Sequence, residues 1–126
     1  DSEMFIPGGN VLLIALTAVG CRSHGVVRIP IGSLGGNPFP DATPEFFESF
    51  ASVLSAGLGH EISVEAPFRG RKKVDLIRSH SGLPLELTLT CATPAGTSDC
   101  GDCNKCTERR DAFLKSGVED RTKYLK

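Results

Sequence analysis

The sequence predicts an α/β fold built on a parallel sheet, and three observations lead to this prediction. Residues 26–31 form a run rich in β-branched side chains, which is typical of a strand covered on both faces. Residues 62–66 alternate apolar and polar positions and predict a second strand. The segment between them has the apolar spacing of an amphipathic helix. Strand, helix and strand in this order form a βαβ unit, which is expected to be a right-handed crossover.

The segment before the first strand predicts a buried helix. Residues 11–19 are apolar at nearly every position, and Asn10 precedes them as a candidate N-cap. A helix that is apolar all round is expected to be covered on every side. The loop over residues 32–40, after the first strand, is too rich in Gly and Pro to be regular.

Thr43, Pro44 and Glu45 predict the start of the central helix. Thr caps free backbone amides, Pro presets the first helical φ, and Glu complements the positive end of the helix dipole. Gly57 or Gly59 is expected to end this helix. Its buried stripe is expected to consist of Phe46, Phe47, Phe50, Val53, Leu54 and Leu58.

The second half of the chain predicts three further elements and a domain boundary. A short helix is expected around residues 72–79, a strictly alternating strand at 85–90, and a helix over 104–116 that Gly117 stops. We place the boundary after residue 90. Residues 1–90 are then a partial α/β domain, and residues 91–126 are a metal-binding loop and helix packed on it.

Composition excludes two classes of partner. The 126 residues carry 14 basic and 15 acidic side chains, and 40% are hydrophobic, as in one soluble globular domain. A net charge of -1 argues against direct nucleic-acid binding. The apolar run 11–19 is far shorter than the roughly 20 residues that a bilayer requires, so no membrane partner is expected.

Four of the five cysteines predict a metal site. They are separated by eight, two and two residues: Cys91, Cys100, Cys103 and Cys106. Four thiolates at such spacing are typical of a closed, structural zinc site, which leaves no position for water or substrate. Lys105, Arg109, Arg110 and the start of the following helix are expected to offset the negative charge.

The odd cysteine total favours a reducing, cytoplasmic compartment over a disulfide framework. Disulfide pairing and an iron–sulfur cluster remain the alternatives to zinc. Cys21 stands alone in an apolar segment, where a thiol behaves as a small hydrophobe, so it receives no role.

Several motifs resemble those of one family. The cysteine motif, with Leu87-Thr88-Leu89-Thr90-Cys91 before it and Arg109, Ala112 and Phe113 after it, looks like the C-terminal zinc motif of the 7-cyano-7-deazaguanine synthase (QueC/ExsB) family. Upstream matches in the same order are Phe5-Ile6-Pro7-Gly8-Gly9-Asn10, Phe39-Pro40-Asp41, Glu45-Phe46, Ala66-Pro67 and Lys73. The resemblance spans residues 5–113, nearly the whole chain.

The resemblance implies a fold and a reaction. The fold is a Rossmann-like (adenine nucleotide alpha hydrolase-like) parallel sheet with helices on both faces. The activity is an ATP-dependent carbon–nitrogen ligase that converts 7-carboxy-7-deazaguanine to 7-cyano-7-deazaguanine with ammonia, on the way to queuosine.

Three residues are candidates for this chemistry. Lys73 is placed to neutralise an acyl-adenylate phosphate, and Asn10 and Asp41 are placed to bind the 7-deazaguanine substrate. Each also has a simpler interpretation: Lys73 as a solvated cation, Asn10 as a helix cap and Asp41 as a turn residue.

The chain departs from the family pattern in ways that predict an incomplete enzyme. It lacks the phosphate loop Ser-Gly-Gly-x-Asp-Ser, for which residues 32–36 are no substitute, so ATP and Mg²⁺ are expected only with a missing N-terminal half. The chain begins with Asp1 rather than Met, which suggests a processed or truncated piece. We expect a homo-oligomer or a complex with a chain that carries the loop, with residues 11–19 or 26–31 at the interface.

Departures from the family pattern at two sites leave other functions open. Gly9 stands where the family has Arg, and Ala42-Thr43 stand where it has Cys-Arg. One alternative is a QueC-like enzyme that attaches a deazapurine to another acceptor. The other is a non-catalytic, zinc-stabilised binding module.

Overall fold

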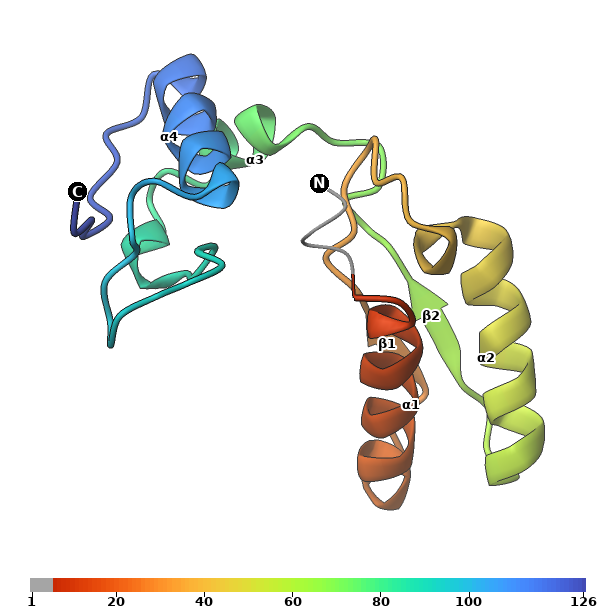
Figure 1. Ribbon diagram of the computed structural model, residues 1–126. Helices are drawn as coiled ribbons and strands as arrows, with labels where there is room; N and C mark the ends of the chain where they lie inside the picture. Colours follow the sequence, from red (N-terminus) through yellow and green to blue (C-terminus); the bar gives the residue numbers. More distant parts are fainter. Residues whose placement is uncertain (1–5) are drawn as a thin grey trace. The chain divides into compact units, whose positions relative to one another are not determined.

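The computed structural model describes residues 6–126 and divides them into two compact units (Figure 1). The N-terminal unit ends at Gly70 and the C-terminal unit begins at Arg71. This boundary lies before the predicted one at residues 90 and 91, because helix α3 (Lys73–Ser79) packs against helix α4 (Asn104–Ser116). Residues 71–90 therefore belong with the cysteine loop. Phe5, the first residue of the resemblance, lies outside the described residues.

The N-terminal unit contains the predicted βαβ arrangement. Its elements are α1 (Gly9–Cys21), β1 (Arg28–Pro30), α2 (Pro44–Leu58) and β2 (Ser63–Glu65). The two strands pair in parallel, with Ile29 opposite Val64. In Figure 1, α1 overlies β1 and α2 lies beside β2. The parallel sheet with packed helices that defines the predicted fold class is confirmed.

Helix α2 begins and ends where its local sequence predicts. The Thr43 hydroxyl accepts a hydrogen bond from the Phe46 amide at 3.1 Å, and Pro44 is the first helical residue. Gly59 ends the helix in the left-handed conformation, with φ of 58°. Within the predicted apolar stripe Phe47 is buried, whereas Val53 is 65% exposed, so the prediction was wrong for Val53.

One face of the strand pair carries the core. Ile29 of β1 packs with Ala18 of α1 and with Leu54 and Leu58 of α2, so both helices contact the same face. A second cluster joins Ile14 of α1 to Ala42 and Phe47. Arg28 and Glu65 alternate with the core residues and form an exposed ion pair of 2.7 Å. Coverage of this second face by helices stays a prediction.

Helix α1 differs from its prediction in two respects. Its N-cap is Gly8, with φ of 73°, and Asn10 lies inside the helix. The helix is also not buried on every side, because β1, α2 and the turn at residues 40–42 cover only the face of Ile14 and Ala18. The opposite face carries four side chains that are 60–62% exposed: Leu12, Leu13, Leu16 and Val19. No helix within residues 6–126 has the length and apolar character to cross a membrane.

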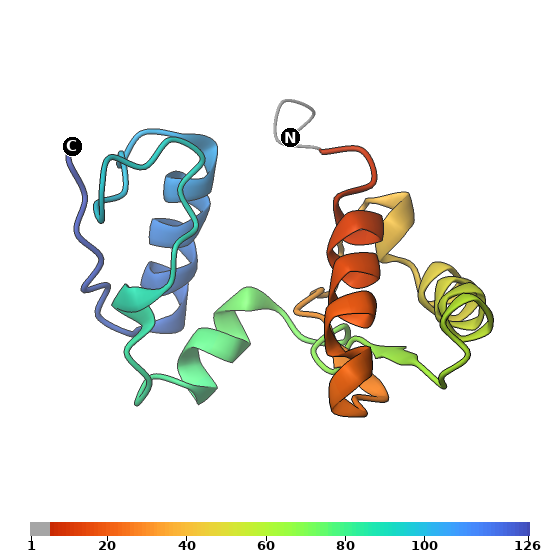
Figure 2. The ribbon, with the colours of Figure 1, turned by 90° about the horizontal axis from the view of Figure 1, so that it is seen from below.

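The C-terminal unit has little regular structure besides its two helices. Helix α4 covers the predicted residues, and Gly117 ends it with φ of 73°. The predicted strand at residues 85–90 is wrong: a 3₁₀ turn occupies Leu85–Leu87, and no ladder follows it within the described residues. Figure 2 shows the cysteine loop passing the first turn of α4 and the last residues running back along the same helix.

Candidate metal centre

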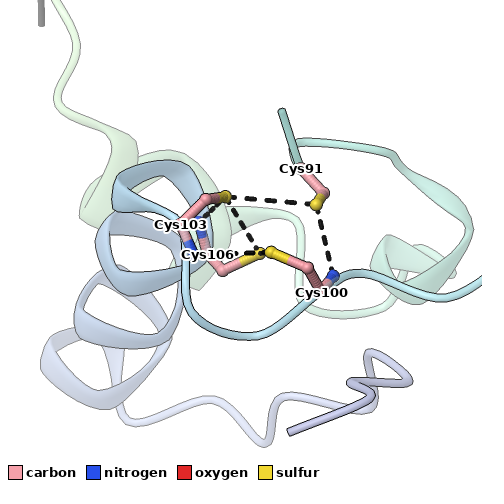
Figure 3. Close-up of side chains that lie close together, drawn as sticks. All are labelled: Cys91, Cys100, Cys103 and Cys106. Atoms are coloured by element: carbon pink, nitrogen blue, oxygen red, sulfur yellow. Dashed lines mark hydrogen bonds between the residues drawn. The ribbon is translucent and has the colours of Figure 1, made fainter. Parts of the chain in front are cut away.

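The four cysteines predicted to bind metal lie together (Figure 3). Their sulfur atoms all lie within 4.8 Å of one another. The pairs Cys103–Cys106, Cys100–Cys106 and Cys91–Cys103 are 3.5, 3.9 and 4.0 Å apart. Sulfurs bound tetrahedrally at about 2.3 Å from zinc are separated by about 3.8 Å. The donor set can therefore hold a metal ion with little rearrangement. All five cysteines of the chain are free thiols.

The start of α4 positions two of these ligands. Cys103 is the N-cap of the helix, and its sulfur accepts a hydrogen bond from the amide of Cys106 at 3.4 Å. The sulfur of Cys100 accepts one from the amide of Cys103 at 3.4 Å. The two-residue gaps thus let backbone amides at a positive helix end donate to the sulfur atoms, which favours thiolates.

Cys91 reaches the site from the other end of the loop. Its sulfur accepts hydrogen bonds from the amides of Thr93 at 3.3 Å and Cys100 at 3.2 Å. Ala95 and Ser98 exchange backbone hydrogen bonds of 3.0 and 3.1 Å, which close the intervening residues into a tight turn. The eight residues between Cys91 and Cys100 are therefore folded back, so that the two sulfurs meet.

The pKa values of two of the thiols are shifted in opposite directions. Hydrogen bonds from the amides of Ala92 and Cys106 lower the pKa of the Cys103 thiol to about 6. Burial raises the pKa of the Cys106 thiol to about 12. A dication binds thiolates, so metal binding has to displace the proton from the buried Cys106.

Arg109 on α4 connects the ligands to the rest of the C-terminal unit. Only 5% of it is exposed, and its guanidinium donates to the hydroxyls of Thr88 and Thr90, both at 3.0 Å. It also donates to the Leu85 carbonyl at 2.7 Å and to the Thr122 hydroxyl at 2.8 Å. The alternating pattern at residues 85–90 therefore does not come from a strand. Its threonines bind Arg109, and this holds the chain segment that leads to Cys91.

The predicted charge-compensating residues bind protein groups. Lys105 forms an ion pair with Glu108 at 3.3 Å, and Arg110 donates to the Gly101 carbonyl at 2.8 Å. Sequence reasoning missed the last nine residues, which contact the same loop through Tyr124. The only sequence signal was Tyr124 itself, the single tyrosine of the chain.

The two predicted substrate-binding residues, Asn10 and Asp41, contact each other. The backbone amide of Asn10 donates to Asp41 Oδ2 at 2.9 Å, and its side-chain amide donates to the Asp41 carbonyl at 3.0 Å. Arg69, after β2, donates to the Ala42 carbonyl at 2.5 Å. Loops that follow both strands and the start of α1 therefore converge, at the strand ends where α/β sheets place their ligands.

Lys73, the predicted catalytic residue, begins α3 in the C-terminal unit. Its ammonium group forms an ion pair with Glu108 of α4. The bond from Lys73 lowers the pKa of the Glu108 carboxyl. The pair belongs to the contact between α3 and α4, so Lys73 has a structural partner whether or not it also serves chemistry.

Comparisons with known proteins identify related sequences. The family described as "Queuosine biosynthesis protein QueC" matches residues 2–117. The 7-cyano-7-deazaguanine synthase of Legionella pneumophila (strain Paris) is 35% identical over 133 residues, which cover 97% of this chain and 58% of that protein.

Two further relatives carry the same name. The protein of Anaeromyxobacter dehalogenans (strain 2CP-C) is 31% identical over 131 residues, covering 97% of this chain and 56% of the relative. That of Methanocaldococcus jannaschii is 31% identical over 133 residues, covering 97% of this chain and 57% of the relative. The chain thus spans about half the length of the curated relatives it matches.

Proposed function

This chain belongs to the QueC family of queuosine biosynthesis proteins, and we propose that it supplies the metal-binding half of an ATP-dependent ligase. The proposed reaction converts 7-carboxy-7-deazaguanine to 7-cyano-7-deazaguanine with ATP and ammonia. The observation that carries this proposal is the cluster of four sulfurs within 4.8 Å in a chain of this family. A cytoplasmic location is part of the proposal, because free thiolates persist in reducing compartments.

The proposed metal is zinc in a structural role. Cys91, Cys100, Cys103 and Cys106 would hold it, and when bound it cross-links the loop to the start of α4. Four thiolates complete the coordination of zinc, so the ion offers no open position for catalysis. The chemistry is then left to side chains and to bound nucleotide.

The two proposed contacts to the deazaguanine, Asn10 and Asp41, lie in the N-terminal unit. Asp41 is 7% exposed and its carboxylate is held by Asn10, so its orientation is set before any ligand arrives. Each carboxylate oxygen has more than one acceptor site, and the remaining capacity suits the N–H groups of a 2-aminopyrimidinone edge. Lys73 belongs to the C-terminal unit, and its proposed role is to neutralise the phosphate of an acyl-adenylate in exchange for its ion pair with Glu108.

ATP and Mg²⁺ are proposed to bind a phosphate loop on another polypeptide segment, since residues 1–126 do not contain one. The exposed residues Leu12, Leu13, Leu16 and Val19, which we call the α1 face, support this arrangement. Soluble domains rarely leave such a cluster uncovered. The proposed cover is an α/β segment with the phosphate loop, or a second copy of this chain in a homo-oligomer.

A different acceptor is the second candidate function. Gly9 and Ala42-Thr43 lie next to the Asn10–Asp41 pair, where the family carries two arginines. Loss of both cations beside the proposed substrate contacts favours a changed co-substrate, such as an amine on another macromolecule in place of ammonia. A non-catalytic binding module would share the zinc site and the α1 face, but it would use neither ATP nor a deazapurine.

The test is a fusion in which the N-terminal half of the Legionella pneumophila relative precedes Asp1. One zinc per chain and a single sedimenting species would establish that the fusion is folded. We expect 7-cyano-7-deazaguanine, detected by mass spectrometry, only when ATP, ammonium and 7-carboxy-7-deazaguanine are all present. A folded fusion that consumes ATP but forms another deazapurine adduct supports the second candidate. A folded fusion that binds neither ATP nor substrate contradicts both enzyme functions.

A further inference from the structure

The last residues of the chain return to the metal loop. Residues 118–126, which we call the C-terminal segment, place Tyr124 beside Asp99 in a parallel bridge. The Asp99 amide donates to the Lys123 carbonyl, and the Leu125 amide donates to the Asp99 carbonyl, both at 2.9 Å. Asp99 is 3% exposed and directly precedes the ligand Cys100. The C-terminal segment therefore binds both the amide and the carbonyl of Asp99, the residue that precedes the proposed ligand Cys100.

Arg110 joins the same segment to the next part of the loop. Its guanidinium donates to the Gly101 carbonyl at 2.8 Å and to the Lys126 carbonyl at 2.5 Å. The same group lies 4.0 Å above the centre of the Tyr124 ring. Gly101 has φ of 89°, and a Cβ at this position would collide with the Lys126 carbonyl. Between the proposed ligands Cys100 and Cys103, the backbone of Gly101 therefore packs directly against the backbone of Lys126.

Tyr124 is held within the C-terminal segment, which is joined to α4 through Thr122 and Arg109. Its hydroxyl donates to Asp120 Oδ2 at 2.6 Å, and Asp120 Oδ1 accepts from the Thr122 amide at 3.0 Å. The Thr122 hydroxyl accepts from Arg109, which also holds the approach to Cys91. Burial and the bond to Asp120 raise the pKa of Tyr124 to about 12, so its hydroxyl remains a donor at neutral pH. Both ends of the metal loop are thus tied to one segment.

We propose, on the basis of the metal site proposed above, that the C-terminal segment is a latch that slows loss of the metal ion. Arg110 and Tyr124 are its positioning residues. The loop that carries Cys100 and Cys103 would have to open before a bound ion could leave. Each opening breaks the Asp99 bridge and the bonds of Arg110, so the latch lowers the population of open states. Changes to such outer contacts typically alter metal affinity by about 10- to 100-fold.

The test measures metal transfer from the zinc-loaded 126-residue chain to an excess of a chromophoric chelator. We expect Tyr124→Ala and Arg110→Ala to release zinc on the order of 10-fold faster or more. Tyr124→Phe keeps the ring over Arg110 and loses only the bond to Asp120, so its rate is expected between those of Tyr124→Ala and the unchanged chain. Arg110→Lys keeps the charge without the forked geometry and is expected to behave as the alanine variant does. The matched control is Arg121→Ala, because Arg121 belongs to the same segment and forms an ion pair with the exposed Glu119.

Two further measurements separate a latch from general loss of structure. Amide hydrogen exchange is expected to accelerate over residues 99–104 in Tyr124→Ala while the urea midpoint of the N-terminal unit stays unchanged. The cobalt-loaded chain is expected to keep four-thiolate absorption bands in every variant. One zinc per chain with unchanged release rates in both alanine variants would overturn the latch and leave the metal site standing. A chain that binds no zinc would instead overturn the proposed metal site.

Discussion

The two units of this protein are stabilised in different ways. The N-terminal unit packs apolar side chains between two helices and two strands, with Ile14, Ile29 and Phe47 as its centre. The C-terminal unit buries few large apolar side chains. It is organised instead by Arg109, by hydrogen bonds from α4 to the surrounding loops, and by four converging thiols.

This difference predicts what each unit requires from outside. Burying an apolar side chain contributes about 1.5–3 kcal/mol, and the N-terminal unit leaves four of them exposed on the α1 face. We propose that this unit requires a polypeptide surface that covers the α1 face. In the C-terminal unit the thiols are clustered already, so we propose that this unit requires an ion, whose binding energy would also be folding energy.

Removal of the metal is expected to have the largest effect and to act on one unit only. Zinc binding to such sites is worth on the order of 10 kcal/mol, so chelation should loosen residues 90–117 before the N-terminal unit melts. Hydrogen exchange followed by mass spectrometry resolves the two units. Cys106→Ser should have the same effect, whereas the control Cys21→Ser should not. Equal protection of residues 90–117 with and without chelator would show that the metal does not organise this unit.

Loss of Arg109 is expected to be the next largest effect. Arg109→Ala removes a buried guanidinium and leaves Thr88, Thr90 and the Leu85 carbonyl without this donor, and the loss of three such part-buried bonds costs about 3 kcal/mol in total. Urea unfolding of the zinc-loaded chain measures this change. The control on the same helix is Lys115→Ala, whose exposed pair with Asp111 should contribute less than about 0.5 kcal/mol. Equal unfolding midpoints for the two variants would contradict the central role of Arg109.

The α1 face is expected to control association with little effect on folding. Leu12→Gln with Leu16→Gln should shift the 126-residue chain toward the monomer in sedimentation, because both side chains are about 60% exposed. Val53→Gln is the control, since Val53 is equally exposed but lies on α2. If the unchanged chain is already a monomer at high micromolar concentration, self-association through this face is excluded.

The smallest expected effect is at the start of α1. Asp41→Ala removes the carboxylate that accepts from the Asn10 amide, and loss of such a cap costs about 1 kcal/mol. Thermal unfolding of the N-terminal unit measures it, and Thr43→Ala, which removes the cap of α2, provides a matched value. A loss several times larger for Asp41 would indicate that a second contact of its carboxylate, in which Oδ1 accepts from the Asn10 side-chain amide at 3.4 Å, also supports the core.

Prediction from sequence succeeded where neighbouring residues decide the structure. Thr43 and Pro44 start α2, Gly59 ends it, and Gly117 ends α4, because caps act within one helical turn. The cysteine cluster was predictable for the same reason, since the two-residue gaps place Cys100, Cys103 and Cys106 in consecutive turns. The identity of the family also follows from these local motifs.

Prediction failed where distant residues compete for the same groups. Asn10 has the properties of an N-cap, but Asp41, 31 residues away, supplies the carboxylate at this helix end, and Gly8 takes the cap position. Residues 85–90 alternate as a strand does, but Arg109 binds two of their threonines and a carbonyl. Backbone and side-chain groups form hydrogen bonds with the partners that the fold brings close. When such a partner is distant in sequence, a local sequence pattern does not predict it.

The sequence by itself determined the limits of α2, the end of α4, the parallel pairing of two strands and the four cysteines that can hold a metal ion. Each depends on residue type and on spacing along the chain. The tertiary structure alone decided that the α1 face stays exposed within residues 6–126 and that the C-terminal segment closes over the metal loop. The reason is physical: burial and long-range hydrogen bonds depend on distances between segments, and these exist only once the chain has folded.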